Sequence, residues 1–212
     1  MKHKYDVYVS LGYNCEVSFR IQDYFKRKID SYPFSWVYIT DFEKFVRALF
    51  KLDDILKHEV EFLPWGMILD KKYGLSFHPK INKKELFFED GNLNLQKADE
   101  ALAELKERFL YLLSKFKKLL ASDKRTLFVI KVRSEDLKSE WLKVLYSYLK
   151  DNYLTGNFKL LVVTEKSKVD IYSINWMESS KIGVGMVEYF AKDSETETGG
   201  DIDGWMRVLA EA

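Results

Sequence analysis

The chain has 212 residues, of which 47% are hydrophobic and 32% are charged, a composition that suits one well-buried globular domain. Its 34 Lys and Arg residues nearly balance 33 Asp and Glu residues, which excludes the basic excess expected of a general nucleic-acid binder. The single cysteine excludes an internal disulfide and any zinc site built from cysteine pairs.

The beginning of the chain is charged and leads directly into a strand pattern, without the apolar segment of a signal peptide. The longest aliphatic or aromatic runs, such as residues 127–130 and 160–163, are far shorter than the roughly 20 residues that span a bilayer. A lone free thiol suits a reducing interior. We therefore expect a cytoplasmic protein with no membrane and no nucleic-acid partner.

Periodicity predicts the elements of the first half in chain order. Residues 5–11 alternate as a strand does and stop at Gly12, and residues 15–28 place apolar side chains on one helical face. A helix is predicted over residues 41–57, with an aspartate at its N-cap. The aromatic segment 59–92 is the least regular part of the chain and contains glycine and proline. We interpret it as an insertion over the site.

The second half shows a clearer rhythm. A long helix is predicted over residues 94–120, where apolar positions step by three and four. It is followed by predicted strands at 126–132, 158–164, 171–176 and 184–190, and by predicted helices at 135–149 and 203–210. Near-continuous apolar strands separated by amphipathic helices indicate a parallel sheet covered on both faces. The predicted fold class is α/β, a single three-layer domain over residues 1–212 with a mostly parallel sheet flanked by helices.

The first candidate for chemistry is the stretch Ser10-Leu11-Gly12-Tyr13-Asn14-Cys15, in which a strand, a glycine turn and a helix start follow one another. It lies at the carboxyl end of a strand, where open α/β sheets bind ligands. Asn14 is the expected N-cap, so Cys15 falls in the first helical turn, where backbone N–H groups and the helix dipole stabilise a thiolate. The N–H groups of residues 12–15 are the candidate oxyanion hole. The alternative is that Cys15 is simply a small buried hydrophobic residue.

A thiolate nucleophile needs a base within hydrogen-bond reach, which is usually a histidine. Of the three histidines, His3 lies in the charged N-terminus and His58 follows a predicted helix end, whereas His78 lies in an irregular aromatic loop fixed by Pro79. Asp203 is expected to cap the last helix, and it could also orient an imidazole as the third member of a triad. The alternatives are a structural histidine and a capping role alone.

The remaining motifs predict no cofactor. Gly183-Val184-Gly185 begins a strand and lacks the third glycine of a dinucleotide-binding fingerprint. No His, Cys or carboxylate groups have the usual ligand spacings, so no metal site is predicted, although an oxygen-only site stays open.

Four short blocks follow one another along the chain: Ser10-Leu11-Gly12-x-Asn14-Cys15, Tyr32-Pro33-Phe34-Ser35-Trp36, Gly74-Leu75-Ser76-Phe77-His78 and Gly200-x-x-Asp203-Gly204-Trp205. In this order they resemble the blocks of a bacterial family of unknown function, described as putative papain-like cysteine peptidases. The resemblance implies a pair in which Cys15 is the nucleophile and His78 the base. It also implies that the second block shapes the site. On this basis we expect substrate contacts from five residues: Gly12, Asn14, Phe34, Trp36 and Trp205.

Two features depart from that resemblance. Ser35 stands where the family usually has an aspartate, so if that acid orients the histidine, either Asp203 or Asp41 replaces it or the activity is reduced. Papain-like enzymes carry their histidine on an antiparallel sheet, whereas the rhythm of this chain predicts a parallel one. A nucleophile between strand and helix, with an aspartate before the last helix, also resembles the SGNH-type esterases. Those enzymes need a histidine in the last block, and this chain has none after His78.

The leading hypothesis is therefore a cysteine-dependent hydrolase or acyl-transferase that uses Cys15, His78 and Asp203. The alternative is a non-catalytic or glycan-associated binding module, because aromatic residues make up 16% of the chain and four of them are expected to flank the same candidate cleft: Trp36, Trp65, Tyr73 and Phe77. A third hypothesis is the transfer of a group from a nucleotide-linked donor. The predicted sheet is compatible with it, but the sequence contains no phosphate-binding motif that supports it. The bond cleaved, the peptide, glycan or small-molecule nature of the substrate and the oligomeric state stay open.

Overall fold

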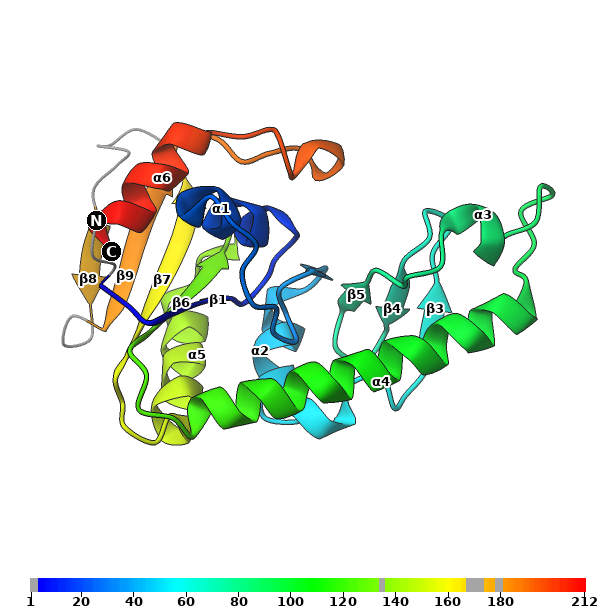
Figure 1. Ribbon diagram of the computed structural model, residues 1–212, viewed down its shortest axis with the longest axis horizontal. Helices are drawn as coiled ribbons and strands as arrows, with labels where there is room; N and C mark the ends of the chain where they lie inside the picture. The colour runs from blue at the N-terminus through cyan, green and yellow to red at the C-terminus, as the bar shows by residue number, and fades with distance from the viewer. Residues whose placement is uncertain (1–3, 134–135, 167–173, 178–180) are drawn as a thin grey trace.

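A computed structural model describes residues 4–133, 136–166, 174–177 and 181–212, which form two β-sheets and six α-helices (Figure 1). One sheet has five strands in the order β1-β6-β7-β9-β8, and the other has four in the order β2-β5-β4-β3. The long helix α4 (Leu95–Leu120) runs past both of them (Figure 1). Among the described residues, no helix is long and apolar enough to cross a membrane.

The five-stranded sheet is mostly parallel. Its strands are β1 (Val7–Ser10), β6 (Thr126–Lys131), β7 (Phe158–Glu165), β9 (Ile182–Val187) and β8 (Ile174–Met177), of which only β8 runs antiparallel to its neighbour. Alternate residues of β6 face opposite sides: Leu127 and Val129 pack against α1 (Glu16–Phe25) and α6 (Ile202–Glu211), whereas Phe128 and Ile130 pack against α2 (Phe42–Leu49) and α5 (Ser139–Asn152). Burial on both faces explains why these strands are continuously apolar.

The four-stranded sheet is entirely antiparallel and is built from strands of three residues each. They are β2 (Val37–Ile39), β3 (Val60–Phe62), β4 (Ile68–Asp70) and β5 (Leu75–Phe77), followed by the short helix α3 (Lys83–Leu86). Helix α4 joins this sheet to the first one through two phenylalanines. Phe109 meets Phe77 of β5 at 5.7 Å between ring centroids, and Phe116 meets Phe128 of β6 at 6.2 Å. One apolar cluster therefore extends from one sheet to the other.

The prediction of a mixed α/β chain with a parallel sheet is confirmed, but the sequence did not predict the second, antiparallel sheet. The helix expected over residues 41–57 ends at Leu49 and is followed by a 3-10 turn at Leu52–Asp54, although Asp41 does cap it, accepting from the Lys44 N–H. Part of the strand expected over residues 171–176 lies outside the described residues. Strand β8 covers its second half.

Candidate functional site

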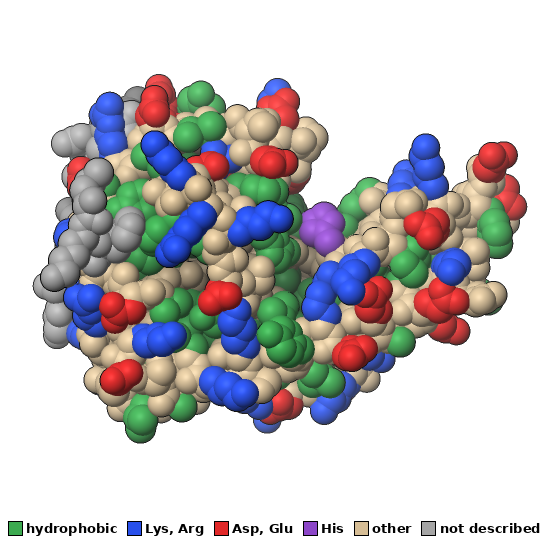
Figure 2. Space-filling model, in the orientation of Figure 1, with side chains coloured by type: hydrophobic (Ala, Val, Ile, Leu, Met, Phe, Trp, Pro, Cys, Tyr) green, Lys and Arg blue, Asp and Glu red, His purple; other side chains and the backbone are tan. Residues whose placement is uncertain are grey.

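The two sheets meet where the sequence placed its first candidates. Cys15 follows β1 and immediately precedes α1, and His78 follows β5. The Cys15 Sγ atom lies 3.5 Å from Nε2 of His78, although 63 residues separate them in the chain. A histidine side chain is visible in the hollow between the two parts of the molecule (Figure 2). A cysteine at a helix start therefore faces a histidine at the end of an antiparallel strand, as the papain-like resemblance implies.

A strained turn brings Cys15 to this position. Gly12 has a φ of +89°, and a Cβ atom there would lie 2.8 Å from the carbonyl oxygen of Phe34. Tyr13 also has a positive φ, 98°, which is costly for a residue with a side chain. Its carbonyl accepts a hydrogen bond from the Ile39 N–H, so the turn ties β1 to the antiparallel sheet. Gly12 is thus required by the backbone path, and its expected contact with substrate stays a prediction.

Asn14 and Cys15 each lie one position earlier relative to the helix than expected. Cys15 occupies the N-cap position, and the Asn14 Oδ1 accepts from the Glu16 N–H at 3.1 Å. Within the part of the chain that the structure describes, no hydrogen bond uses the backbone N–H groups of Asn14 and Cys15. Because they precede a ten-residue helix, these two donors are well placed to stabilise a negative charge beside the Cys15 thiol.

The electrostatics of the pair differ from the expectation. Burial raises the pKa of the half-buried Cys15 thiol to about 11. Burial of the inner side of the ring and the positive charge of Arg108 lower the pKa of His78, although much of this side chain is open to solvent. Near neutral pH both groups are therefore uncharged. The direction of the change at Cys15 is opposite to the stabilised thiolate that the sequence predicts, because burial removes solvation from the charged form.

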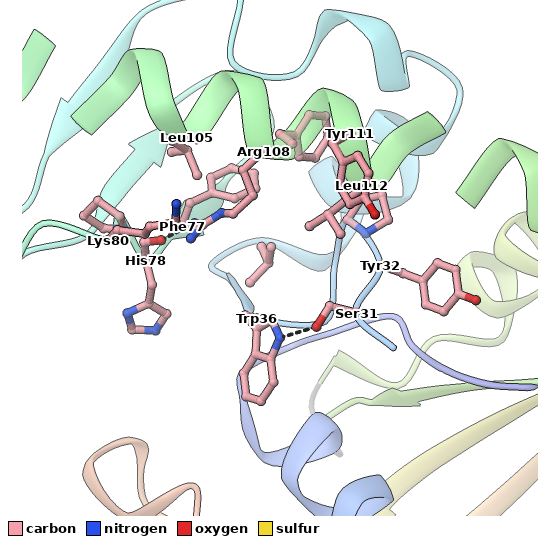
Figure 3. A pocket seen from close by; sticks show the side chains of 14 residues that line it. Ser31, Tyr32, Trp36, Phe77, His78, Lys80, Leu105, Arg108, Tyr111 and Leu112 are labelled. Atoms are coloured by element: carbon pink, nitrogen blue, oxygen red, sulfur yellow. Dashed lines mark hydrogen bonds between the residues drawn. The ribbon is translucent and has the colours of Figure 1, made fainter. Parts of the chain in front are cut away.

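Helix α4 holds the backbone of His78. The Arg108 guanidinium donates a hydrogen bond to the His78 carbonyl oxygen (Figure 3). Among the described residues, no carboxylate forms a hydrogen bond with the His78 ring. The backbone of this histidine is thus fixed by a cation, whereas a triad fixes the imidazole through an acid.

None of the acids expected to orient His78 reaches it. Asp203 is exposed in the first turn of α6, and the residue that caps this helix is Asp201, whose Oδ1 accepts from the Gly204 N–H at 2.9 Å. The prediction of Asp203 as the N-cap is therefore wrong. Asp41 caps α2 instead. The Ser35 hydroxyl accepts from the Tyr32 N–H at 2.9 Å, a bond that an aspartate at this position could also accept.

Two of the expected substrate contacts lie in the core. Phe34 is fully buried and packs edge-to-face against Phe45 and Phe116. Trp205 is also fully buried. Neither side chain can reach a ligand, so both assignments are corrected. Asn14 and Trp36, by contrast, line cavities beside the Cys15–His78 pair.

Sequence reasoning missed Glu16, the residue after Cys15. Its carboxylate is fully buried and forms an ion pair with Lys131 at 2.7 Å. It also accepts hydrogen bonds from the Trp205 indole at 3.2 Å and from the Ala191 N–H at 3.1 Å. A Cβ atom on Gly200 would lie 2.7 Å from Glu16 Oε1. The last sequence block therefore surrounds Glu16, and an acid beside the cysteine together with a lysine ending a buried strand was the available signal.

The cavity that contains the pair has a volume of about 740 Å³. Ser76 of β5 and His78, directly after this strand, line it, while the intervening Phe77 packs against Phe109 of α4. The segment 193–198 forms another wall. Arg20 donates to the carbonyl oxygens of Thr196 and Glu197 and so fastens this segment to α1. The described residues include no group of three or more His, Cys, Asp or Glu side chains that could hold a metal ion.

Comparison with known proteins agrees with this arrangement. The family described as "Putative papain-like cysteine peptidase (DUF1796)" matches residues 6–167, which is more than half of the chain and includes both Cys15 and His78. The chain belongs to this family. No curated protein and no solved structure matches it.

Proposed function

We propose that this protein is a cysteine-dependent hydrolase or acyl-transferase in which Cys15 is the nucleophile and His78 the general base. The observation that carries the proposal is the 3.5 Å separation between Cys15 Sγ and His78 Nε2, contributed by two different sheets. Membership in a family of papain-like cysteine peptidases supports it. The segment 59–92, interpreted as an insertion over the site, supplies His78 and the cavity residues Trp65 and Met67.

The uncharged state of both groups defines the first step. The His78 Nε2 removes the thiol proton while the Cys15 sulfur forms a bond to the carbonyl carbon. The backbone N–H groups of Asn14 and Cys15 donate hydrogen bonds to the oxyanion. The imidazolium then protonates the leaving group, which departs and leaves a thioester. A water molecule, deprotonated by His78, attacks this thioester, and the thiol is regenerated; in an acyl-transferase another nucleophile takes the place of water.

A dyad is sufficient for this sequence of steps. Arg108 fixes the backbone of His78, and its charge disfavours the imidazolium that forms after the first proton transfer. This repulsion promotes transfer of the proton onward to the leaving group. We therefore assign no catalytic role to Asp203.

The proposal is tested by hydrolysis of p-nitrophenyl acetate and of an acetyl thioester. We expect the Cys15→Ala and His78→Ala variants to lose turnover by about a thousandfold or more, with unchanged circular dichroism. The matched control is His58→Ala, since His58 is exposed on another surface and pairs with Asp54. An acetyl adduct that mass spectrometry detects on the wild-type protein and does not detect on Cys15→Ala identifies Cys15 as the nucleophile. Equal turnover by wild type and Cys15→Ala contradicts the proposal.

Two observations favour the second candidate, a non-catalytic or glycan-associated binding module. The raised pKa of Cys15 is what a cysteine with a packing role has, and Trp65, with 64% of its surface exposed, offers a flat aromatic face at the cavity. The pH dependence of Cys15 alkylation in wild type and His78→Ala distinguishes the two candidates. A catalytic pair predicts that the pH profile of Cys15 alkylation changes when His78 is replaced by alanine. A packing cysteine predicts the same profile in both proteins.

A further inference from the structure

A second cavity adjoins the proposed site, and nothing in the reaction described above uses it. It has a volume of about 510 Å³, within the range of roughly 300–1,000 Å³ that holds drug-sized ligands. It lies between α4 and the segment that leads into β2 (Figure 3). Its wall is mostly aromatic and aliphatic, and includes Tyr32, Trp36, Phe77, Leu105, Phe109 and Leu112.

Several polar groups of this wall are already engaged with the protein. The Trp36 indole donates to the Ser31 hydroxyl at 2.9 Å, and Lys80 forms an ion pair with Glu104. Arg108 donates to the His78 carbonyl but has no hydrogen-bonded carboxylate among the described residues. The cavity therefore suits an apolar ligand. The half-buried guanidinium of Arg108 lies at the end of the cavity next to His78.

His78 connects the two cavities, since it lines both of them. An apolar chain attached to a carbonyl group at Cys15 can therefore pass His78 and enter the second cavity. A peptide would more commonly bind by adding a strand to a free sheet edge. The edge of β2 that faces Cys15 is not free, because Tyr13 already pairs with Tyr38 there. An acyl chain thus agrees better with the surroundings of Cys15 than an extended peptide does.

We propose that this cavity binds the acyl chain of the substrate and that the substrates are medium-chain fatty acyl esters or thioesters. The inference rests on the proposed function, since it places the carbonyl carbon at Cys15 Sγ. The sulfur forms a bond to this carbon, the bond to the alcohol or thiol breaks, and His78 protonates that leaving group. Water then releases the fatty acid and restores the Cys15 thiol. The carboxylate of the product lies at the end of the cavity that carries Arg108.

Binding of the product tests the proposal without requiring catalysis. The probes are acetate, hexanoate, octanoate and decanoate, titrated calorimetrically into the full-length Cys15→Ala variant. We expect affinity to rise by about fourfold for each methylene group that is buried, until the chain fills the cavity. Acetate and decanoate binding equally, or neither binding at all, overturns the proposal. This titration also separates the two inferences: if decanoate binds but wild type hydrolyses no decanoyl ester, the acyl site stands and the proposed function fails.

Two neighbouring leucines of α4 provide a matched pair of variants. Leu112 lines the cavity, whereas Leu110 is exposed and lies outside it. We expect Leu112→Glu to weaken decanoate binding at least tenfold and Leu110→Glu to leave it unchanged. If Leu112→Glu does not fold, Leu112→Ala, which removes apolar contact without adding charge, is used in its place. The assignment is contradicted if the changes at positions 110 and 112 weaken decanoate binding equally. It is also contradicted if the protein cleaves a capped phenylalanine peptide in preference to a decanoyl ester.

Discussion

The two sheets contribute unlike parts of the candidate site. Cys15 is attached to the five-stranded sheet, where the carboxylate of its neighbour Glu16 is fully buried and interacts with Lys131, Ala191 and Trp205. His78 directly follows a three-residue strand of the antiparallel sheet, has an exposed side chain, and accepts a hydrogen bond from Arg108 at its backbone carbonyl. The nucleophile therefore adjoins a buried polar network, whereas the base is held by a hydrogen bond to its backbone and by the 3.5 Å contact of its ring with Cys15.

Because of this difference, we expect substitutions near the nucleophile and substitutions near the base to affect stability and activity differently. Changes around Glu16 break a buried network, so they should lower the free energy of unfolding together with activity. Changes around Arg108 alter the position and the pKa of one exposed imidazole, so they should affect activity at nearly constant stability. The predictions below test that division.

The largest expected effect is on the buried ion pair. Glu16→Gln leaves the Lys131 ammonium buried without a negative partner, and breaking such a pair costs about 3–5 kcal/mol of unfolding free energy. Urea denaturation measures it. The control is Glu43→Gln, which breaks the exposed pair with Arg47 on α2 and should cost no more than about 1 kcal/mol. A loss in Glu16→Gln as small as that of the control shows that the pair does not hold the nucleophile's helix.

A smaller loss of unfolding free energy is expected when a side chain is added at Gly200, next to Glu16. Gly200→Ala adds a methyl group 2.7 Å from Glu16 Oε1 at a φ of +83°. Gly91→Ala has nearly the same φ, +84°, but its Cβ atom would meet nothing within 4 Å. Both variants carry the backbone penalty of about 1 kcal/mol, so the extra loss in Gly200→Ala, on the order of 1–3 kcal/mol, reports crowding against the Glu16 carboxylate and against the Ala191 backbone nitrogen, which would lie 2.8 Å away. Equal unfolding free energies for the two variants show that Glu16 and Ala191 both move aside without cost.

The same contrast between the sheets explains what the sequence could predict of the fold. Strands β6 and β7 are long and apolar because both faces are buried, and α4 repeats its apolar positions over many turns, so these elements have unmistakable patterns. The strands of the antiparallel sheet have three residues each, too few to show a period. Ser76 of β5 is also buried although polar, which hides the alternation further.

The candidate site was predictable only in part. The strand–turn–helix pattern made Cys15 a candidate nucleophile and the search for a base made His78 its candidate partner, and the structure places their side chains 3.5 Å apart. The raised pKa of Cys15 could not be predicted, because loss of solvation depends on which distant segments cover the thiol. Arg108 is one of many charged residues on a long helix, and nothing in the sequence indicates that it contacts the backbone of His78. Glu16 was missed because an acid in a first helical turn is usually exposed.

The smallest change in stability and a clear change in pH dependence are expected for Arg108→Met. In wild type the pKa of His78 is lower than the ordinary pKa of a histidine. His78 therefore stays a neutral base to a lower pH, and the acid limb of the pH–activity profile lies below the ordinary histidine pKa. Removing the cation raises the pKa of His78, so the acid limb moves to higher pH, and loss of the bond to its carbonyl lowers kcat by between about tenfold and a hundredfold.

The control for this variant is Arg47→Met, which removes an exposed guanidinium on α2 and should leave the pH profile unchanged. An acid limb that stays in place in Arg108→Met, or that moves to lower pH, shows that the guanidinium does not act on the imidazole. A loss of unfolding free energy as large as that of Glu16→Gln shows instead that Arg108 is part of the core, and that the base is as firmly built in as the nucleophile. Only a shifted profile at unchanged stability agrees with an exposed base whose backbone is held by Arg108 at the end of β5.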